Sequence, residues 1–271
     1  MASASVTISS DPFAQRFAQL SARQRSALVV YVTAGHPDLS GSLELLRGVA
    51  EAGADVVEVG VPFSDPLADG PVIQASSQRA LEGGMTFDRT LELIARAELR
   101  VPVVLFTYLN PLLAAGKNAL GRAASAGANG VLVTDLPLGA DPPLEERIAN
   151  GPLAFVRLVA PTTPSHRMAE IARHGSGFVY LISRMGVTGL RSEISPELPG
   201  TVARLRAATE LPICVGFGIS TPAQAAVVAR LADGVVVGSA VVRAADSSVD
   251  EAVELVRTLR TAIDEARQPG G

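Results

Sequence analysis

Eight short runs rich in Val and Ile recur along the chain, and stretches of helical pattern separate them. Strands that alternate with helices indicate parallel βαβ units. The pattern therefore predicts an α/β fold, a (β/α)8 barrel that forms a single domain over residues 1–271, with 1–10 as a disordered tail. The eight expected strands are Ala27–Thr33, Asp55–Val61, Pro102–Tyr108, Gly130–Asp135, Leu153–Ala160, Phe178–Ser183, Pro212–Phe217 and Gly234–Gly238.

Two features favour a closed barrel with an extra N-terminal helix over an open doubly wound sheet. The sequence Ala-Gly-Ala, in which the glycine ends a helix and leads into the next strand, occurs at Gly53 and again at Gly127, two βα units later. In addition, no Gly-rich turn follows the first strand. Asp11 followed by a proline marks the start of a helix before that strand. Phe13 and Phe17 fall on one face of this helix.

Several scarcities exclude whole classes of chemistry. The net charge of −4 offers no basic field for nucleic acid or an anionic membrane, and the apolar runs are far shorter than a membrane span. Cys214 is the single cysteine, so disulfides and a cysteine metal cluster are excluded. The single lysine, Lys117, lies in a helical stretch that does not suit Schiff-base catalysis, and His166 and His174 have a surface pattern. We expect a cytoplasmic protein with no metal site.

Glu58 interrupts an otherwise apolar strand. The active sites of such barrels lie at the C-terminal ends of the strands, where burial raises the pKa of a carboxyl group and suits it to proton transfer. A structural ion pair is the alternative reading of Glu58. The loop that follows carries Asp65 and Asp69, and Asp69 can fold back over the barrel mouth. Taken alone, either aspartate could equally serve a turn or a helix cap.

Glycines at the ends of the last two strands indicate a phosphate site. Gly218 follows the seventh strand, and Gly238 with Ser239 follows the eighth. Small residues there allow backbone N–H groups to approach an anion at helix N-termini, and phosphate sites recur at this place in the fold. After the sixth strand, a long loop from Gly186 to Pro196 is typical of a lid.

Several longer segments together resemble the tryptophan synthase alpha subunit family. The resemblance extends from about Ala27 to Val242, and the combination of motifs is highly specific. The matching segments are Glu58-Val-Gly-Val-Pro-Phe-Ser-Asp-Pro-Leu-Ala-Asp-Gly-Pro71, Ser183-Arg-Met-Gly-Val-Thr-Gly189, Val215-Gly-Phe-Gly-Ile-Ser220, Tyr31-Val-Thr-Ala-Gly35, Tyr108-Leu-Asn-Pro111 and Asp135-Leu-Pro137.

The resemblance implies a reaction and a set of site residues. Indole-3-glycerol phosphate would be cleaved to indole and glyceraldehyde 3-phosphate, with Glu58 as acid and base, Asp69 as the partner of the indole nitrogen and Tyr180 beside the glutamate. It implies a phosphate site at Gly189, Gly218, Gly238 and Ser239. It implies an indole pocket formed by Tyr31, Ile73, Phe106, Leu132, Val159 and Phe217.

The resemblance also implies a partner. This chain would hold no cofactor and would pass indole to a beta subunit that carries pyridoxal phosphate, in an alpha2beta2 assembly. The loop at Asp65 and the segment Tyr108–Pro111 match the family's docking surface. Three alternatives remain: a lyase that works alone and releases indole, a catalytically silent regulatory subunit, and another phosphosugar barrel such as an isomerase. The signature from Glu58 to Asp69 does not suit an isomerase.

Three places depart from the family's usual pattern. Segment Leu138–Gly151 lacks the acidic helix start expected after the fourth strand. Arg157 shares the parity of Val159 in the fifth strand, and a charge inside the barrel would need a partner that the sequence does not reveal. His36 could line the barrel mouth or lie in a turn, and the turn is favoured.

Overall fold

The parallel strands close into a barrel, as the sequence predicts. The computed structural model describes residues 11–183 and 195–267. Its strands follow the order β5-β4-β3-β2-β1-β9-β8-β7-β6, and only Val156 separates β5 from β6, so these two are halves of the fifth expected strand. The strands are β1 Ala27–Thr33, β2 Val56–Gly60, β3 Val103–Thr107, β4 Gly130–Val133, β5 Ala154–Phe155, β6 Arg157–Val159, β7 Val179–Ile182, β8 Ile213–Gly216 and β9 Gly234–Val237.

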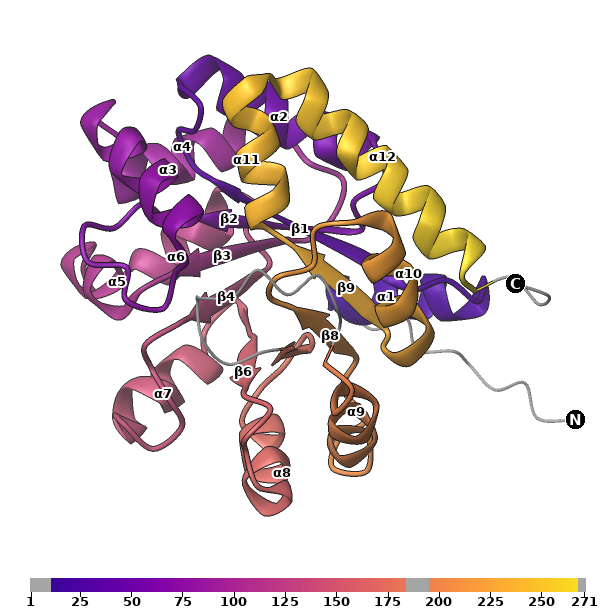
Figure 1. The fold of residues 1–271 in the computed structure, drawn as a ribbon. Helices are drawn as coiled ribbons and strands as arrows, with labels where there is room; N and C mark the ends of the chain where they lie inside the picture. Colours follow the sequence, from indigo (N-terminus) through magenta and orange to yellow (C-terminus); the bar gives the residue numbers. More distant parts are fainter. Residues whose placement is uncertain (1–10, 184–194, 268–271) are drawn as a thin grey trace, which may run out of the picture.

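Helices surround this barrel (Figure 1). Within the described ranges, none of them is long and apolar enough to cross a membrane. The helices are α1 Pro12–Ala22, α2 Leu39–Glu51, α3 Pro71–Glu82, α4 Phe87–Ala97, α5 Leu109–Ala114, α6 Ala119–Ser125, α7 Pro142–Ala149, α8 Ser165–Arg173, α9 Leu198–Arg206, α10 Pro222–Leu231, α11 Ser239–Ser247 and α12 Val249–Glu265.

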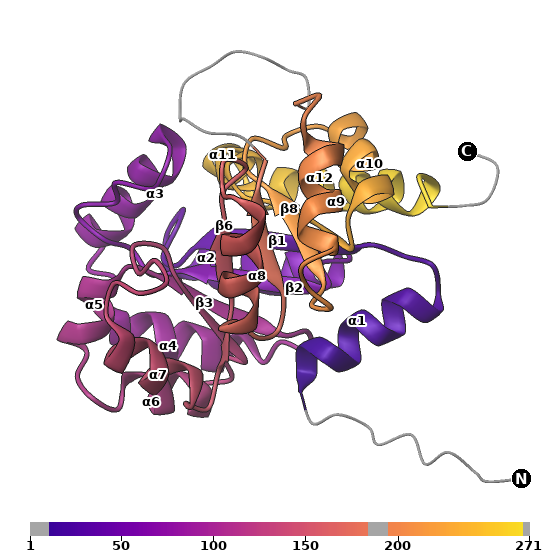
Figure 2. The ribbon, with the colours of Figure 1, turned by 90° about the horizontal axis from the view of Figure 1, so that it is seen from below.

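The expected N-terminal helix, α1, lies at the end of the barrel where the strands begin (Figure 2). Asp11 caps it by accepting the backbone N–H of Phe13 at 2.9 Å. The fully buried Phe13 ring fits against Gly130 and Gly177, where an added Cβ would lie within 3.0 and 3.2 Å of neighbouring atoms. The lower end of the barrel is therefore filled by apolar side chains.

Strand alternation places the one charged side chain of β2 inside the barrel. Val57 and Val59 join the apolar layer between strands and helices, whereas Val56 belongs to the cluster inside the barrel. Glu58 has the parity of Val56, so its side chain also points inward. Because every residue of β2 is buried, its carboxyl group lies among apolar neighbours.

Arg157 lies on the outside of the barrel, which corrects the expectation of a charge in its interior. Its guanidinium donates to the Glu145 carboxylate at 2.7 Å and lies 3.8 Å from the centre of the Phe155 ring. Glu145 stands in the first turn of α7, and Asp141 caps that helix. The segment Leu138–Gly151 therefore does contain an acidic helix start, and its acid is the partner that the sequence did not reveal.

His36 lies in the turn after β1, as favoured from the sequence. Its backbone N–H donates to the carbonyl of Thr33 at 3.2 Å. The imidazole is buried, with Nε2 at 3.3 Å from the carbonyl oxygen of Val242 and 3.4 Å from Asp246. Burial lowers the pKa of His36, which favours the neutral ring. The side chain therefore anchors α11 against this turn.

Candidate active site

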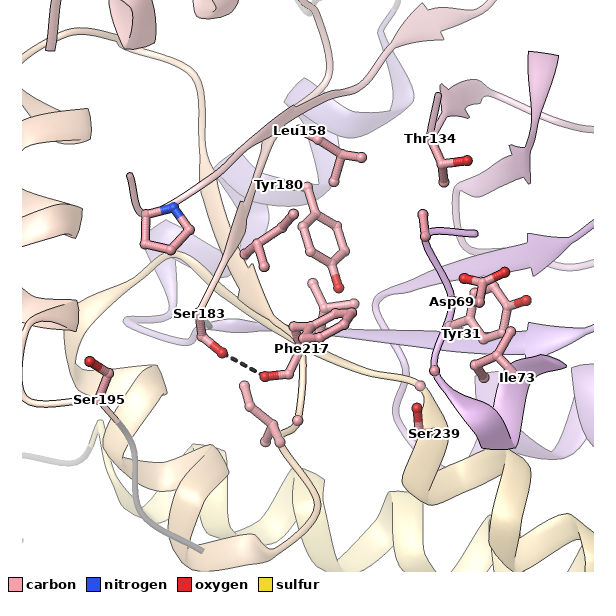
Figure 3. Close-up of a pocket in the computed structure, with 18 of the residues that line it drawn as sticks. Tyr31, Asp69, Ile73, Thr134, Leu158, Tyr180, Ser183, Ser195, Phe217 and Ser239 are labelled. Carbon is pink, nitrogen blue, oxygen red and sulfur yellow. Dashed lines mark hydrogen bonds between the residues drawn. The ribbon is translucent and has the colours of Figure 1, made fainter. Parts of the chain in front are cut away.

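A cavity of about 970 Å³ opens at the C-terminal ends of the strands. Its walls come from side chains of the barrel interior and from the loops that follow β2, β6, β8 and β9 (Figure 3). Most of the residues expected at the site are brought together here. They are Tyr31, Glu58, Asp69, Ile73, Phe106, Tyr180, Phe217, Gly218, Gly238 and Ser239.

Glu58 reaches the floor of this cavity with its carboxyl group almost completely buried. Its side chain is only 1% exposed, and its Oε1 atom has no hydrogen-bond partner among the described residues. Burial raises the pKa of Glu58 to about 8 because the charged form loses its hydration. The ion-pair reading of Glu58 therefore finds no support in the described part of the chain, and the group is predominantly protonated at neutral pH.

Asp69 also lines the cavity, from the loop that joins β2 to α3 (Figure 3). Burial raises its pKa to about 6, and a hydrogen bond with the Tyr108 side chain opposes this rise by stabilising the carboxylate. The Tyr108 hydroxyl also accepts the backbone N–H of Ala68 at 3.0 Å. Tyr108 thus attaches this loop to the end of β3.

Two glycines make room for the aromatic rings beside Glu58. A Cβ at Gly60 would lie 2.1 Å from the hydroxyl oxygen of Tyr31, and one at Gly216 would lie 2.4 Å from that of Tyr180. Both positions therefore require glycine. Tyr31 also meets Phe106 edge to face, with 5.1 Å between ring centres. The rings enclose an apolar space next to the carboxyl group.

The end of the cavity formed by the start of α11 and the loop after β8 presents backbone donors. Helix α11 begins at Ser239, and no side chain of the described residues caps it, so the N–H groups of its first turn can bind an anion. Phe217 and Gly218 both have positive φ values, 85° and 82°, and Phe217 is held there because Ser183 donates to its carbonyl oxygen at 2.6 Å (Figure 3). This end of the cavity has the character of a phosphate site.

Two of the expected indole-wall residues do not line the cavity. Val159 is fully buried in the layer between strands and helices, because the parity of β6 directs Leu158 inward instead. Leu132 is fully buried among the side chains inside the barrel and does not reach the cavity surface. Gly189 and the expected lid from Gly186 lie outside the described residues, apart from the end of that segment at Pro196.

Many of the residues that line the cavity were not anticipated as site residues. Leu158, Thr134, Ser183 and Arg243 all line it. Arg243 could have been found from its spacing, since it follows Ser239 by one helical turn. Among the described residues, no group of three or more His, Cys, Asp or Glu side chains could hold a metal ion.

The fold and the site define a (β/α)8-barrel enzyme with a buried carboxyl group, that of Glu58, and a half-buried one, that of Asp69, at its mouth. The family model for the tryptophan synthase alpha chain matches residues 17–268. The chain therefore belongs to the tryptophan synthase alpha chain family, and it is a lyase, as the sequence motifs imply.

Relatives and solved structures agree with this assignment. The tryptophan synthase alpha chain of Desulfatibacillum aliphaticivorans is 46% identical over 92% of this chain and 93% of its own length. That of Citrifermentans bemidjiense is 49% identical over 84% and 86%. The solved structure of the alpha subunit from Legionella pneumophila superposes with a TM-score of 0.85 at 33% identity, over 95% of this chain and all of that one.

Proposed function

We propose that this chain cleaves indole-3-glycerol phosphate to indole and glyceraldehyde 3-phosphate, with Glu58 as acid and base and Asp69 as the charge partner of the indole nitrogen. One observation carries this assignment of roles. Two carboxyl groups face one cavity, and the pKa is about 8 for Glu58 but about 6 for Asp69. Near pH 7, Glu58 can therefore donate a proton while Asp69 is mainly a carboxylate.

The protonation states suit the steps of a retro-aldol cleavage. Protonated Glu58 gives its proton to the indole ring carbon that bears the side chain, and the positive charge that results is shared with the ring nitrogen. The Asp69 carboxylate accepts the N–H of that nitrogen and stabilises the charge. Glu58, now a carboxylate, removes the proton of the side-chain hydroxyl. The carbon–carbon bond then breaks, its electron pair returns to the ring, and the hydroxyl carbon becomes the aldehyde.

The cavity matches the two ends of this substrate. Tyr31, Phe106, Leu158 and Tyr180 provide an apolar space next to Glu58 for the indole ring. The free N–H groups at the start of α11, with Gly218 nearby in the wall, suit the phosphate.

Asp69→Asn tests the assigned roles. The amide has nearly the same shape but no negative charge, so it cannot offset the charge at the indole nitrogen. We expect kcat to fall at least about 100-fold, as when an electrostatic stabiliser is lost. Asp65→Asn is the matched control, since Asp65 lies on the same loop but does not line the cavity. If Asp69→Asn retained most of its activity, Asp69 would be a turn residue.

We further propose that the partner is a tryptophan synthase beta subunit that carries pyridoxal phosphate, in an alpha2beta2 complex. Leu67 is 92% exposed on the loop that holds Asp69, and Leu113 is 50% exposed on α5. A partner that covers Leu67 would order the Asp69 loop and so raise the rate of cleavage. Binding of substrate here would in turn tighten the complex, because coupling between two sites is reciprocal.

Titration of a beta subunit against this chain separates the remaining alternatives. We expect the rate of indole-3-glycerol phosphate cleavage to rise with the beta subunit and saturate. Leu67→Ser should weaken that response, whereas Val227→Ser, at an exposed apolar residue of α10, should not. A full rate without the beta subunit and no response to it would favour the lyase that works alone. No cleavage under either condition would favour the silent subunit.

A further inference from the structure

The charges around the cavity are unbalanced for a ligand that carries phosphate. Three carboxyl groups line it, those of Glu58, Asp69 and Glu197. Among the described lining residues, Arg243 is the single basic side chain. A phosphate dianion that enters this cavity meets carboxylates, which repel it, and backbone N–H groups, which carry only partial charge. A full positive charge at the phosphate end would therefore change the affinity markedly.

Arg243 lies in the right place to supply that charge. It follows Ser239 by four residues on α11, so the two side chains are neighbours on one face of the helix. Side chains of a helix lean toward its N-terminus, and Arg243 therefore extends over the uncapped first turn. Gly238 and Ser239, where this turn begins, both line the cavity, so the N–H groups of the turn are directed toward the ligand.

The guanidinium of Arg243 is also uncommitted. The side chain is exposed and forms no ion pair with any described residue. Asp246 would be a natural partner three residues later on α11, but it pairs with Arg79 and lies 3.4 Å from His36. By contrast, Arg157 and Arg260 each hold a carboxylate of the scaffold. Arg243 is therefore available to a ligand rather than needed by the fold.

We propose that Arg243 binds the phosphate group of the substrate and makes the cavity selective for a phosphorylated ligand over its uncharged counterpart. This proposal rests on the proposed function, since it concerns the same cavity. A guanidinium can donate two parallel hydrogen bonds to phosphate oxygens, and these bonds are stronger than those of neutral donors. Arg243 would thus add a full charge to the backbone donors at the start of α11.

The test compares Arg243→Gln with Arg230→Gln. Arg230 is an exposed arginine at the end of α10, does not line the cavity and undergoes the same change in charge. We expect Arg243→Gln to raise KM for indole-3-glycerol phosphate at least about tenfold and to reduce kcat much less. Arg230→Gln should match the wild type. Arg243→Lys keeps the charge but not the paired donors, so its KM should lie between the two.

Binding of glycerol 3-phosphate, measured by calorimetry, gives a readout that does not depend on turnover. Its Kd should rise at least about tenfold in Arg243→Gln, and raised salt should weaken binding more in the wild type than in this variant. Equal KM and equal Kd in Arg243→Gln and Arg230→Gln would overturn the proposal for Arg243. The proposed function would still stand if the wild type cleaved indole-3-glycerol phosphate. If the wild type cleaved nothing, the function would fail, and glycerol 3-phosphate binding would still decide the role of Arg243.

Discussion

The Tyr108 hydroxyl forms a hydrogen bond with Asp69 while it accepts the backbone N–H of Ala68 at 3.0 Å. The bond to the charged form of Asp69 lowers a pKa that burial would otherwise raise further. Tyr108→Phe keeps the ring beside Phe63, 5.2 Å away between centres, and removes only the hydroxyl. We expect the pKa of Asp69 to rise above about 6. Asp69 must be ionised for catalysis. As the pH is lowered, kcat/KM of the variant should therefore begin to fall at a higher pH than kcat/KM of the wild type.

The pH profile of kcat/KM checks this expectation against a simple loss of structure. The ratio of variant to wild-type activity should be close to its highest value near pH 8, where Asp69 is ionised in both proteins, and should fall to a constant low value as the pH drops below about 6. A ratio that stays equally low at every pH would contradict the account, since it would indicate a displaced loop rather than a shifted pKa.

Substitutions at Gly218 and Gly116 distinguish the effect of backbone strain from an effect on phosphate binding. Both have positive φ values, 82° and 88°, and an added Cβ would have no neighbour within 4 Å at either place. An alanine should therefore cost about 1 kcal/mol at each position. Only Gly218 lines the cavity. We expect Gly218→Ala to raise KM several-fold because the methyl group blocks approach to the phosphate site, and an equal KM in Gly116→Ala and Gly218→Ala would contradict that site.

The buried ion pair between Arg157 and Glu145 should matter for stability but not for catalysis. Both side chains are less than a tenth exposed, and neither lines the cavity. Arg157→Met leaves the Glu145 charge buried without its partner, which should cost about 3–5 kcal/mol of unfolding free energy. Adding Glu145→Met should recover most of that loss. Urea unfolding measures both effects, and a double variant no more stable than Arg157→Met would refute this reading.

Glu58 should make stability depend on pH. Its pKa rises from 4.5 to about 8 on folding, so its contribution to stability is fully present below pH 4.5 and is lost as the pH rises through about 8. The loss should be on the order of a few kcal/mol. Glu58→Gln does not titrate. The variant should therefore gain stability relative to the wild type between pH 5 and pH 9 in urea unfolding, and a difference that is constant with pH would contradict burial as the cause.

Sequence reasoning located Glu58 because strand alternation and a single charge in an apolar run leave little choice of position. Strand five shows its limit. Apart from Arg157, both faces of that strand are apolar, so alternation indicates which residues share a face but not which face points inward. The family resemblance implies that Val159 lines the indole pocket, and alternation could not correct this, although Leu158 lines the cavity instead. The charge of Arg157 was the available clue, since a charged residue fits between the barrel and a helix better than inside the barrel.

Contacts between separate elements were beyond the reach of pattern alone. Glu145 meets Arg157 only because α7 folds back onto β6, and Tyr108 meets Asp69 only because two loops converge at the barrel mouth. The hydrophobic periodicity within a single helix or strand carries no information about contacts between elements that are distant in the sequence. The sequence shows that Ser239 and Arg243 are four residues apart on one helix. Only the structure shows that α11 starts at the cavity, and therefore that Arg243 lies near the phosphate end.

The most direct test of the account is the initial rate at which this chain and its Glu58→Gln variant cleave indole-3-glycerol phosphate at pH 7, with indole and glyceraldehyde 3-phosphate both measured. The account predicts equal amounts of the two products from the wild type. It predicts a rate at least about 100-fold lower from the variant, with an unchanged circular dichroism spectrum, because glutamine cannot donate or accept the proton. Near-normal cleavage by Glu58→Gln would remove Glu58 from the mechanism and contradict the account.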